Sequence, residues 1–244
     1  DAAIKEHEKK VRSITEYLII KQQSMINDVE HITEFLAKKQ KDIKSLSSRC
    51  PSYFLDVKAL NGNIANIGLV NKDGDLICSS NNDAPNINVS DRPYFKNALA
   101  SKEFSIGHFQ HDRSLEAQSI NFASPILNEN NDIEGVIVTV IALDWWSSAL
   151  NSLNLPTEVR VAITDSNNLI LANSPFSADR LGYKLEEFDL EHNLQAGVIF
   201  KGKDGIRRVF HQTTLYRDGN DNKLSIYITQ PIDKTLERID INFV

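Results

Sequence analysis

The feature that most constrains this chain is an uninterrupted helical pattern over residues 3–47, which contain no glycine or proline. Two series of apolar residues recur there in sevens, the second four residues after the first: Ile4, Val11, Leu18, Met25 and Ile32, then Val29, Leu36 and Ile43. This spacing is typical of a helix that buries one continuous stripe. A helix of about 45 residues would span about 70 Å, more than one small module needs. The chain is therefore expected to be elongated, with this helix as its spine.

We expect the two ends of this helix to have different roles. Its first turns pair with a second copy of the chain and give a homodimer. Its later turns, with Phe35 and Leu46 added to the stripe, pack against globular modules. Cys50-Pro51 should end the helix, because the residue before a proline is disfavoured in the helical region.

The remaining sequence predicts two antiparallel sheets in tandem, which makes the fold class α+β. The clearest signal is Lys72-Asp73-Gly74, a tight turn between strands at 63–71 and 75–80. A short helix over 93–100, capped by Ser90 or Asp91, should follow. Further strands are expected at 104–112, 117–127, 134–143, 159–164, 169–173, 197–201, 207–215 and 224–229, with a connecting helix from Asp144. The expected domains are a helix over 1–50, modules at 51–155 and 156–232, and the start of an exit helix at 233–244.

Composition and charge exclude one class of partner. The 244 residues carry 33 Asp and Glu against 27 Lys and Arg, a net charge of −6. A nucleic-acid partner needs a basic face, so none is expected. No stretch approaches the roughly 18 apolar residues of a membrane span, and the first residues show neither a starting Met nor a signal-peptide pattern. We therefore expect a segment of a longer protein.

The most informative short motif is Asp91-Arg92-Pro93-Tyr94-Phe95. An arginine offers five fixed donors that match a carboxylate or phosphate, and aromatic rings exclude water or stack on a ligand. The motif predicts a small-molecule pocket, with the polar loop 81–90 as a lid. The alternative is an arginine in an ordinary surface ion pair beside two core aromatics.

The order of these elements resembles the double Cache family of extracytoplasmic sensor domains over nearly the whole chain. After the long helix come the hairpin over 67–78, the motif at 91–95, Ser119-Ile120-Asn121-Phe122-Ala123-Ser124-Pro125, Gly135-Val136-Ile137-Val138, Leu143-Asp144-Trp145-Trp146 and a second hairpin from Val159. The resemblance implies a long helix packed along two PAS-like modules. The first of these, distal to the membrane, would hold the ligand between its sheet and its lid.

The resemblance also implies roles for single residues. Arg92 stands where the family grips a ligand carboxylate, followed by the aromatics Tyr94 and Phe95. Ile87 and Val140 stand where amino-acid-binding members carry a Tyr and an Asp. Without that Asp, a ligand ammonium lacks its partner. An α-amino acid is therefore disfavoured, whereas a carboxylate or another small anionic or neutral polar metabolite remains open.

Secondary ligand contacts are expected on the strands behind this motif. Side chains alternate along a strand, so His108 and Gln110 share one face, and Asn121 lies on a neighbouring strand. The alternative for all three is a solvated or structural hydrogen bond. In the second module, Arg160, Tyr183, His211 and Tyr216 are candidates for a smaller cavity.

The two cysteines permit one intramolecular disulfide, between Cys50 and Cys78. Two buried free thiols in a reducing cell are the alternative. The resemblance places the chain in the periplasm or outside the cell, which favours the disulfide and a stabilisation of roughly 3 kcal/mol.

Catalysis and metal binding are not expected. No nucleophile elbow or phosphate loop is present in the sequence. His108, His111 and Asp112 are close together, but positions 108 and 111 of a strand face opposite sides. We expect no catalytic residue, metal or cofactor in this chain.

The function that these observations favour is the extracytoplasmic ligand-sensing domain of a transmembrane signalling protein. By analogy, its output is of the histidine kinase or diguanylate cyclase type, joined through membrane segments outside this chain and driven by conformational change. The alternative is a structural or dimerisation module with a vestigial pocket, whose long helix acts by self-association. A freely diffusing solute-binding protein is disfavoured, because it would not need the helix.

Overall fold

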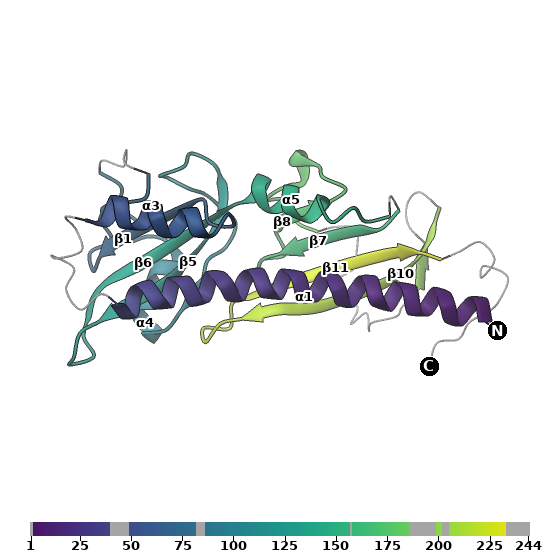
Figure 1. Cartoon of the computed structure of the whole chain (residues 1–244), viewed down its shortest axis with the longest axis horizontal. Coiled ribbons are helices and arrows are strands. Elements are labelled where there is room, and N and C mark those ends of the chain that lie inside the picture. Colours follow the sequence, from purple (N-terminus) through teal and green to yellow (C-terminus); the bar gives the residue numbers. More distant parts are fainter. Residues whose placement is uncertain are drawn as a thin grey trace.

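Helix α1 (Ala2–Lys39) lies along both halves of the molecule, as Figure 1 shows. The computed structural model describes residues 2–39, 49–81, 86–156, 158–185, 199–201 and 205–232. The long helix and the antiparallel sheets predicted from the sequence are confirmed. The buried face of α1 combines apolar and polar side chains: Leu18, Met25, Ile26, Val29, Leu36 and Ala37 with Thr15, Gln22 and Thr33.

The position of this buried stripe differs from the prediction. Phe35 is 53% exposed, so its assignment to the stripe was wrong. The reason is that polar residues occupy the stripe where hydrophobic periodicity does not find them. Thr33 Oγ1 lies 2.7 Å from Thr139 Oγ1 of a sheet, and Gln22 Oε1 accepts a 2.8 Å hydrogen bond from Trp146 Nε1. Ile43, Leu46 and the side chains of Ile4 and Val11 lie outside the described residues.

Cys50-Pro51 begins a helix, which corrects the expectation that it ends one. Helix α3 (Cys50–Leu60) starts there, with the proline in its first turn. A proline is tolerated at that position because the first turn needs no N–H donor, and its fixed φ suits a helix. The helix packs on the first two strands of the chain and buries Cys50 and Phe54.

The first sheet is antiparallel and has the order β2-β1-β6-β5-β3, with β4 also paired to β5. The predicted turn at 72–74 joins β1 and β2, and Leu69 pairs with Cys78. The strands of this sheet are β1 (Asn66–Asn71), β2 (Leu76–Ser79), β3 (Ser105–Ile106), β4 (Gln110–His111), β5 (Gln118–Leu127) and β6 (Ile133–Ala142).

The two faces of this sheet have different covers. The face that carries Ile67, Leu69 and Ile137 packs on α1 and α3. The other face, with Val70 and Val138, packs against helix α4 (Pro93–Ser101) and Val89. We call the first sheet with α3, α4 and residues 86–92 the first module.

Two local predictions in the first module were wrong. Strand 104–112 is broken into β3 and β4, because the N–H of Phe109 is bonded outside the sheet, to Asp165 Oδ2 at 2.8 Å. Helix α4 is preceded by Arg92 as its N-cap residue, and that side chain makes no capping bond. Neither Ser90 nor Asp91 is therefore the cap. Pro93 takes the first helical position, which fits its fixed φ.

The second sheet is also antiparallel and has the order β8-β7-β11-β10-β9. Helix α5 (Leu143–Asn151) connects it to the first sheet, as Asp144-Trp145-Trp146 predicted. The second sheet contacts α1 through the 3.0 Å hydrogen bond from Gln230 Nε2 to Thr15 Oγ1. Its elements are β7 (Arg160–Thr164), β8 (Ile170–Ser174), the 3-10 turn η1 (Ala178–Arg180), β9 (Ile199–Lys201), β10 (Arg207–Arg217) and β11 (Lys223–Pro231). We call this sheet with η1 and Leu185 the second module.

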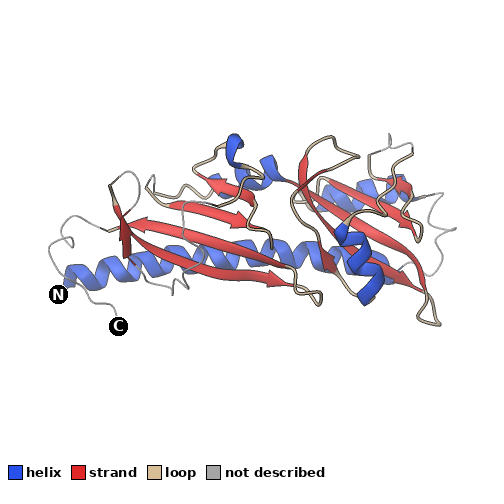
Figure 2. Cartoon of the chain, turned by 180° about the vertical axis from the view of Figure 1, so that it is seen from behind, coloured by secondary structure: helices blue, strands red, loops and turns tan. Residues whose placement is uncertain are grey.

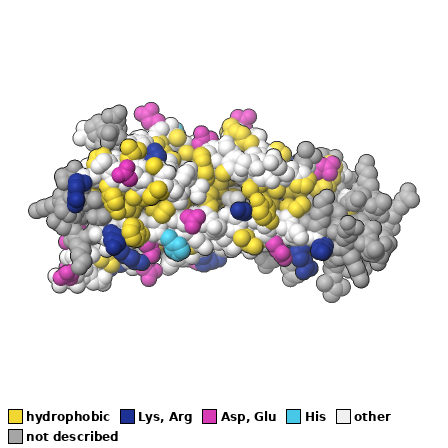
Figure 3. Space-filling model, in the orientation of Figure 1, with side chains coloured by type: hydrophobic (Ala, Val, Ile, Leu, Met, Phe, Trp, Pro, Cys, Tyr) yellow, Lys and Arg dark blue, Asp and Glu magenta, His cyan; other side chains and the backbone are white. Residues whose placement is uncertain are grey.

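The two sheets lie end to end along α1, and the view from behind shows the same arrangement (Figure 2). The beginning of α1 lies beside the second sheet, at the end of the molecule away from the first. Acidic and basic side chains are interspersed over the face seen in Figure 3. The domain boundaries at 50/51 and 155/156 stay predictions, and the expected exit helix at 233–244 lies outside the described residues.

Candidate functional site

A small polar cavity lies on the face of the first sheet that points away from α1. Thr139 of β6 points toward α1, so its neighbours Val138 and Val140 point into this cavity. The cavity volume is about 30 Å³, room for a water molecule or two. Six polar side chains line it: Asn66, Tyr94, Asp112, Arg113, Ser114 and Asn121. In this structure the site is nearly filled by its own side chains.

Asp112 is the centre of the polar lining, and only 5% of it is exposed. Its Oδ1 accepts bonds from the N–H of Ser114 at 2.8 Å, the Ser114 hydroxyl at 2.6 Å and the N–H of Leu115 at 2.9 Å. Its Oδ2 accepts from Asn121 Nδ2 at 2.8 Å. Asn66 of β1 joins through Ser114 Oγ at 2.8 Å. The donors hold a buried negative charge at the base of the cavity, as a buried carboxylate requires.

Tyr94 of α4 closes the network from above. It is 2% exposed, and the side chains of Asn121 and Gln110 lie near its hydroxyl. Burial raises the pKa of Tyr94 to about 12, so its hydroxyl stays protonated and able to donate at neutral pH. Asn121 Oδ1 also accepts a 2.8 Å bond from the Ser119 hydroxyl. The hydrogen-bond network therefore connects β1, the turn at 112–114 and β5, and Tyr94 of α4 lies beside it.

Arg113 ties the segment over the cavity to the turn below it. Its guanidinium makes two bonds to the Asp91 carboxylate, at 2.8 and 2.9 Å, and one to the carbonyl of Asn88. The bond from Arg113 holds the pKa of Asp91 below its ordinary value of 3.8. The side chains are 42% and 59% exposed, so this pair is a weak latch that costs little to break.

The structure separates the six predicted ligand contacts. Tyr94 and Asn121 line the cavity, and Gln110 lies near the Tyr94 hydroxyl without lining the cavity itself. The other three lie outside the lining. Arg92 donates to the carbonyl of His111 at 3.1 Å, and Phe95 is 2% exposed in the core under α4. Among the described residues, the buried Nδ1 of His108 has no hydrogen-bond partner.

Four polar lining residues were not predicted as ligand contacts: Asn66, Asp112, Arg113 and Ser114. A signal for the last three exists, because an Asp followed two residues later by a Ser is typical of a turn closed by the Asp side chain. That signal predicts a turn. It does not predict that the turn folds over the cavity, which depends on the break between β3 and β4.

The hairpin turns of the two modules show a matched pattern of capping side chains. In the first module, Asn71 and Asn128 each accept two N–H bonds from residues two and four positions on, at 2.8 to 3.0 Å. In the second module, Asp165 and Asp218 make the same pairs of bonds, at 2.8 to 3.0 Å. The turn geometry needs one acceptor oxygen, which either residue type supplies.

The aspartates of the second module use their other oxygen to hold the first module. Asp165 Oδ2 accepts the N–H of Phe109 at 2.8 Å, and Asp218 Oδ2 accepts the N–H of Ile106 at 2.9 Å. An asparagine has a single acceptor oxygen and could not make both kinds of bond. The two aspartates are 1% and 7% exposed, so these are buried contacts. We call this pair the junction aspartates.

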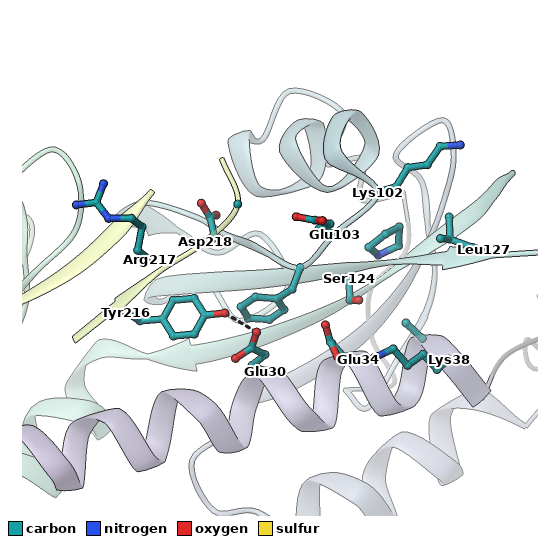
Figure 4. Close-up of a pocket in the computed structure, with 14 residues that line it drawn as sticks. Glu30, Glu34, Lys38, Lys102, Glu103, Ser124, Leu127, Tyr216, Arg217 and Asp218 are labelled. Atoms are coloured by element: carbon teal, nitrogen blue, oxygen red, sulfur yellow. Dashed lines mark hydrogen bonds and ion pairs between the residues drawn. The ribbon is translucent and has the colours of Figure 1, made fainter. Parts of the chain in front are cut away.

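A cleft of about 450 Å³ lies at the same junction, where α1 and both modules meet (Figure 4). Glu30, Glu34 and Lys38 of α1 form one wall, and side chains from the end of α4 and from the turn after β10 face them. The Tyr216 hydroxyl donates to Glu30 Oε1 across the cleft. Burial and this acidic partner raise the pKa of Tyr216 above its ordinary value. The cleft shows that the junction is not close-packed at this side.

A disulfide joins Cys50 of α3 to Cys78 of β2, with the Cα atoms 6.2 Å apart. It links the helix that covers the edge of the first sheet to that sheet. None of the described helices is both long enough and apolar enough to cross a membrane.

Comparisons with known proteins agree with this architecture. The chain matches the Cache domain family over residues 2–239, and no curated protein matches it. It is similar to the extracellular domain of the putative histidine kinase rpHK1S-Z16, with a TM-score of 0.78, 14% identity and coverage of 98% and 100% of the two chains. It is also similar to the sensor domain of the V. cholerae histidine kinase DctB, with a TM-score of 0.66 and 16% identity over 96% of this chain and 98% of that one. A third similar structure is the ligand-binding domain of the Pseudomonas fluorescens chemoreceptor CtaA in complex with L-serine. Its TM-score is 0.73, with 15% identity over 94% of this chain and 99% of that one.

The chain belongs to the Cache domain family, since the match covers nearly all of it. It is an extracytoplasmic ligand-binding sensor domain of the class carried by histidine kinases and chemoreceptors. Domains of this class are non-catalytic binding modules.

Proposed function

We propose that this chain senses a small polar metabolite with a carboxylate group in the cavity of the first module. The signal then passes to the second module and on to an output of the histidine kinase or diguanylate cyclase type, through membrane segments outside the chain. The observation that carries the proposal is the buried polar set Tyr94, Asp112 and Asn121 beneath a segment latched by Arg113.

The lining predicts the chemistry of the ligand. Asp91 occupies Arg113 with a carboxylate, so a ligand carboxylate can take its place on the same two guanidinium nitrogens. At the base, Asp112 offers only acceptor oxygens and favours a ligand hydroxyl or ammonium. The resemblance disfavours an α-amino acid, because Val140 stands where amino-acid-binding members of the family carry an Asp. Asp112 supplies a carboxylate in the same cavity, so amino acids belong among the compounds to test.

Binding requires the segment above the cavity to move. About 30 Å³ does not hold a metabolite, so α4 and residues 86–92 must be displaced and the bond between Arg113 and Asp91 released. A ligand shifts this equilibrium by its differential affinity for the open and closed arrangements. The weak latch keeps that energy difference small.

The movement has a contiguous route to the second module. Tyr94 packs on Gly107, where an added Cβ would lie 3.2 Å from the Tyr94 ring. Gly107 sits between Ile106 and Phe109, whose N–H groups are held by the junction aspartates. Displacement of α4 therefore acts on the segment that Asp165 and Asp218 hold. Such a series of contacts can couple the two modules energetically when its residues have two alternative conformations.

The homodimer through the N-terminal helix also remains a proposal. Tyr17 and Ile20 are 44% and 63% exposed on the outer face of α1, which gives a second copy an apolar surface to contact. Sedimentation of the purified chain at several concentrations tests this part separately from ligand binding.

The experiment that tests the proposal is thermal unfolding of the chain against a panel of carboxylates and amino acids. Ligand at about one hundred times its dissociation constant adds about 2.7 kcal/mol to the free energy of unfolding, which moves the midpoint by several degrees. Arg113→Gln is the test variant. Arg217→Gln is its control, because Arg217 also pairs with an exposed aspartate, Asp221, but lies outside the cavity.

A compound that stabilises the wild type and Arg217→Gln but not Arg113→Gln supports the proposal. Arg92→Gln should weaken binding less than Arg113→Gln, because Arg92 acts through the His111 carbonyl beside Asp112. If no compound shifts a well-folded sample, or if every shift survives Arg113→Gln, the first-module site is wrong. The alternative of a structural or dimerisation module with a vestigial pocket then stands.

A further inference from the structure

The second module contains a cavity ten times larger than the first, about 320 Å³ against about 30 Å³. The sequence predicted a smaller cavity there, lined by Arg160, Tyr183, His211 and Tyr216. Of these only Arg160 lines it. Tyr183 is 67% exposed, and Tyr216 lines the junction cleft instead. A volume near 300 Å³ is at the lower end of the range for small-molecule sites.

The cavity occupies the equivalent position in the repeated fold. Gln230 of β11 points to α1, so Tyr227 of the same strand points to the opposite face. Tyr227 pairs with Ala162, and Ala162 pairs with Asn173, so the three side chains form a row across β11, β7 and β8. All three line the cavity. It therefore opens on the face away from α1, as the first-module cavity does.

Two arginines and no acidic residue are among the described residues that line this cavity. Arg160 lies on β7 and Arg180 ends η1, so the two guanidiniums approach from different elements. Both also interact within the chain. A guanidinium has five donors, so it can hold a ligand oxygen in addition to a partner in the protein. Two such groups at one cavity favour an anion.

The rest of the lining is partly apolar. Ala162, Ile170 and Leu185 are buried, and Phe176 at the outer side is 46% exposed. A purely inorganic anion would leave these surfaces without a partner. A carboxylate with a short hydrocarbon body would contact the arginines at one end and these side chains at the other.

The wall of the cavity is built before any ligand arrives. Asn173 Oδ1 accepts the Ser177 N–H at 2.6 Å, and its Nδ2 donates to the Ser177 carbonyl at 3.0 Å. Asn151 Oδ1 of α5 accepts the Ser174 hydroxyl at 3.0 Å and the Phe176 N–H at 3.1 Å. The segment 174–177 is thus fixed to β8 and α5. A fixed wall reduces the ordering that binding requires.

We propose that the second module is a second binding site, for a small monocarboxylate with a short apolar chain, held by Arg160 and Arg180. This site does not depend on the site proposed in the first module. Occupancy acts close to the junction, since β7 leads directly into the turn of Asp165, which holds Phe109 of the first module. The chain would then bind two ligands, one in each module.

Isothermal titration calorimetry with the whole chain tests this proposal. The probes are sodium acetate, propionate, butyrate, valerate and hexanoate, with butyramide as the uncharged match of butyrate and inorganic phosphate as the anion without an apolar body. At least one carboxylate should bind saturably, and butyramide should not. Arg160→Gln and Arg180→Gln should each weaken binding tenfold or more. Ala162→Leu should abolish binding, because the larger side chain fills the cavity while both arginines are retained.

Arg217→Gln is the control and should leave carboxylate binding unchanged, because Arg217 pairs with the exposed Asp221 and lies outside both cavities. Arg180 is exposed on a turn without buried residues, so its substitution should leave the fold intact. A loss of binding in this variant therefore reports on the site and not on folding. The proposal is overturned if no carboxylate binds, or if butyramide or phosphate binds as well as every carboxylate. It is also overturned if binding survives the three second-module variants or is lost in Arg217→Gln alone.

Discussion

The two modules repeat one sheet order and differ in what covers the sheet. The first is covered by the nine-residue helix α4, which buries Tyr94, Phe95 and Ala98. In the described part of the second module, the cover is a loop that buries Leu181 and Leu185 and the three-residue turn η1, which itself buries no residue. The cavities differ accordingly, about 30 Å³ and about 320 Å³. Among the described residues, the segment after the second strand of each sheet therefore differs more between the modules than the sheet order does.

A second difference concerns the hairpin turns. One acceptor oxygen closes a turn, and the first module uses asparagine for this. The second module uses aspartate, and the additional oxygen reaches across the junction. A single change of residue type thus makes one module hold the other.

The largest expected effect compares the two covers directly. Phe95→Ala should lower the free energy of unfolding by about 3 to 5 kcal/mol, because Phe95 is 2% exposed in a packed core. Phe176→Ala should cost less than about 1 kcal/mol, because Phe176 is 46% exposed at an open cavity. Urea unfolding measures both. Equal losses would show that the two covers are packed alike.

The disulfide gives the next effect, because the second module has no counterpart to it. Replacing both Cys50 and Cys78 by serine should cost about 3 kcal/mol, as expected for a cross-link between residues 28 positions apart. Reduction of the wild type should reproduce the loss measured in the double variant. If the unfolding midpoint of the wild type is the same with and without reductant, the disulfide does not stabilise the fold as described.

The junction aspartates should show an intermediate effect. Asp165→Asn and Asp218→Asn keep an acceptor for the turn but remove the acceptor for Phe109 or Ile106. Each should cost about 1 to 3 kcal/mol by leaving a buried donor unpaired. Asn128→Asp, in the corresponding turn of the first module, is the control and should stay within about 0.5 kcal/mol. The junction has no such role if the control costs as much as the two variants.

The smallest effect concerns the latch over the first cavity. The pKa of Asp91 is lowered in the folded chain, so its pairing with Arg113 stabilises above pH 3.8 and is lost as pH falls through the folded value. The contribution should stay below about 1 kcal/mol, because the pair is exposed. The stability difference between wild type and Asp91→Asn, measured from pH 7 to pH 2, should shrink toward the acid end. A difference that is constant with pH would argue against the latch.

Local patterns predicted much of the fold. The hairpin around 72–74, the connecting helix from Asp144 and the long N-terminal helix follow from turn residues and periodicity. The errors at Cys50-Pro51 and at the cap of α4 are local, because each proline takes a first-turn position in its helix. The other two errors depend on partners distant in sequence. The strand over 104–112 breaks where Asp165 takes the N–H of Phe109, and the stripe of α1 includes Gln22 because Trp146 bonds to it.

The candidate site was predicted in part for the same reason. The motif at 91–95 located the covering helix, and Tyr94 lines the cavity as expected. Arg92 lies outside the lining, and the arginine at the cavity is Arg113, from the hairpin turn before β5, for which a surface role was the favoured prediction. The size of the second-module cavity was not predictable, because it depends on how residues 174–185 fold back over the sheet.

Hydrogen exchange tests the central claim, that ligand binding in the first module acts on the second through residues 105–110. The wild type and the Asp165→Asn/Asp218→Asn variant are compared with and without the compound that gives the largest thermal shift dependent on Arg113. In the wild type, exchange should change over 86–101, at the amides of Ile106 and Phe109, and in the turns at 165–169 and 218–222. In the variant, the changes in the turns should vanish while those over 86–101 remain. Unchanged exchange at Ile106 and Phe109 in the wild type, or turns that respond equally in the variant, would contradict the account.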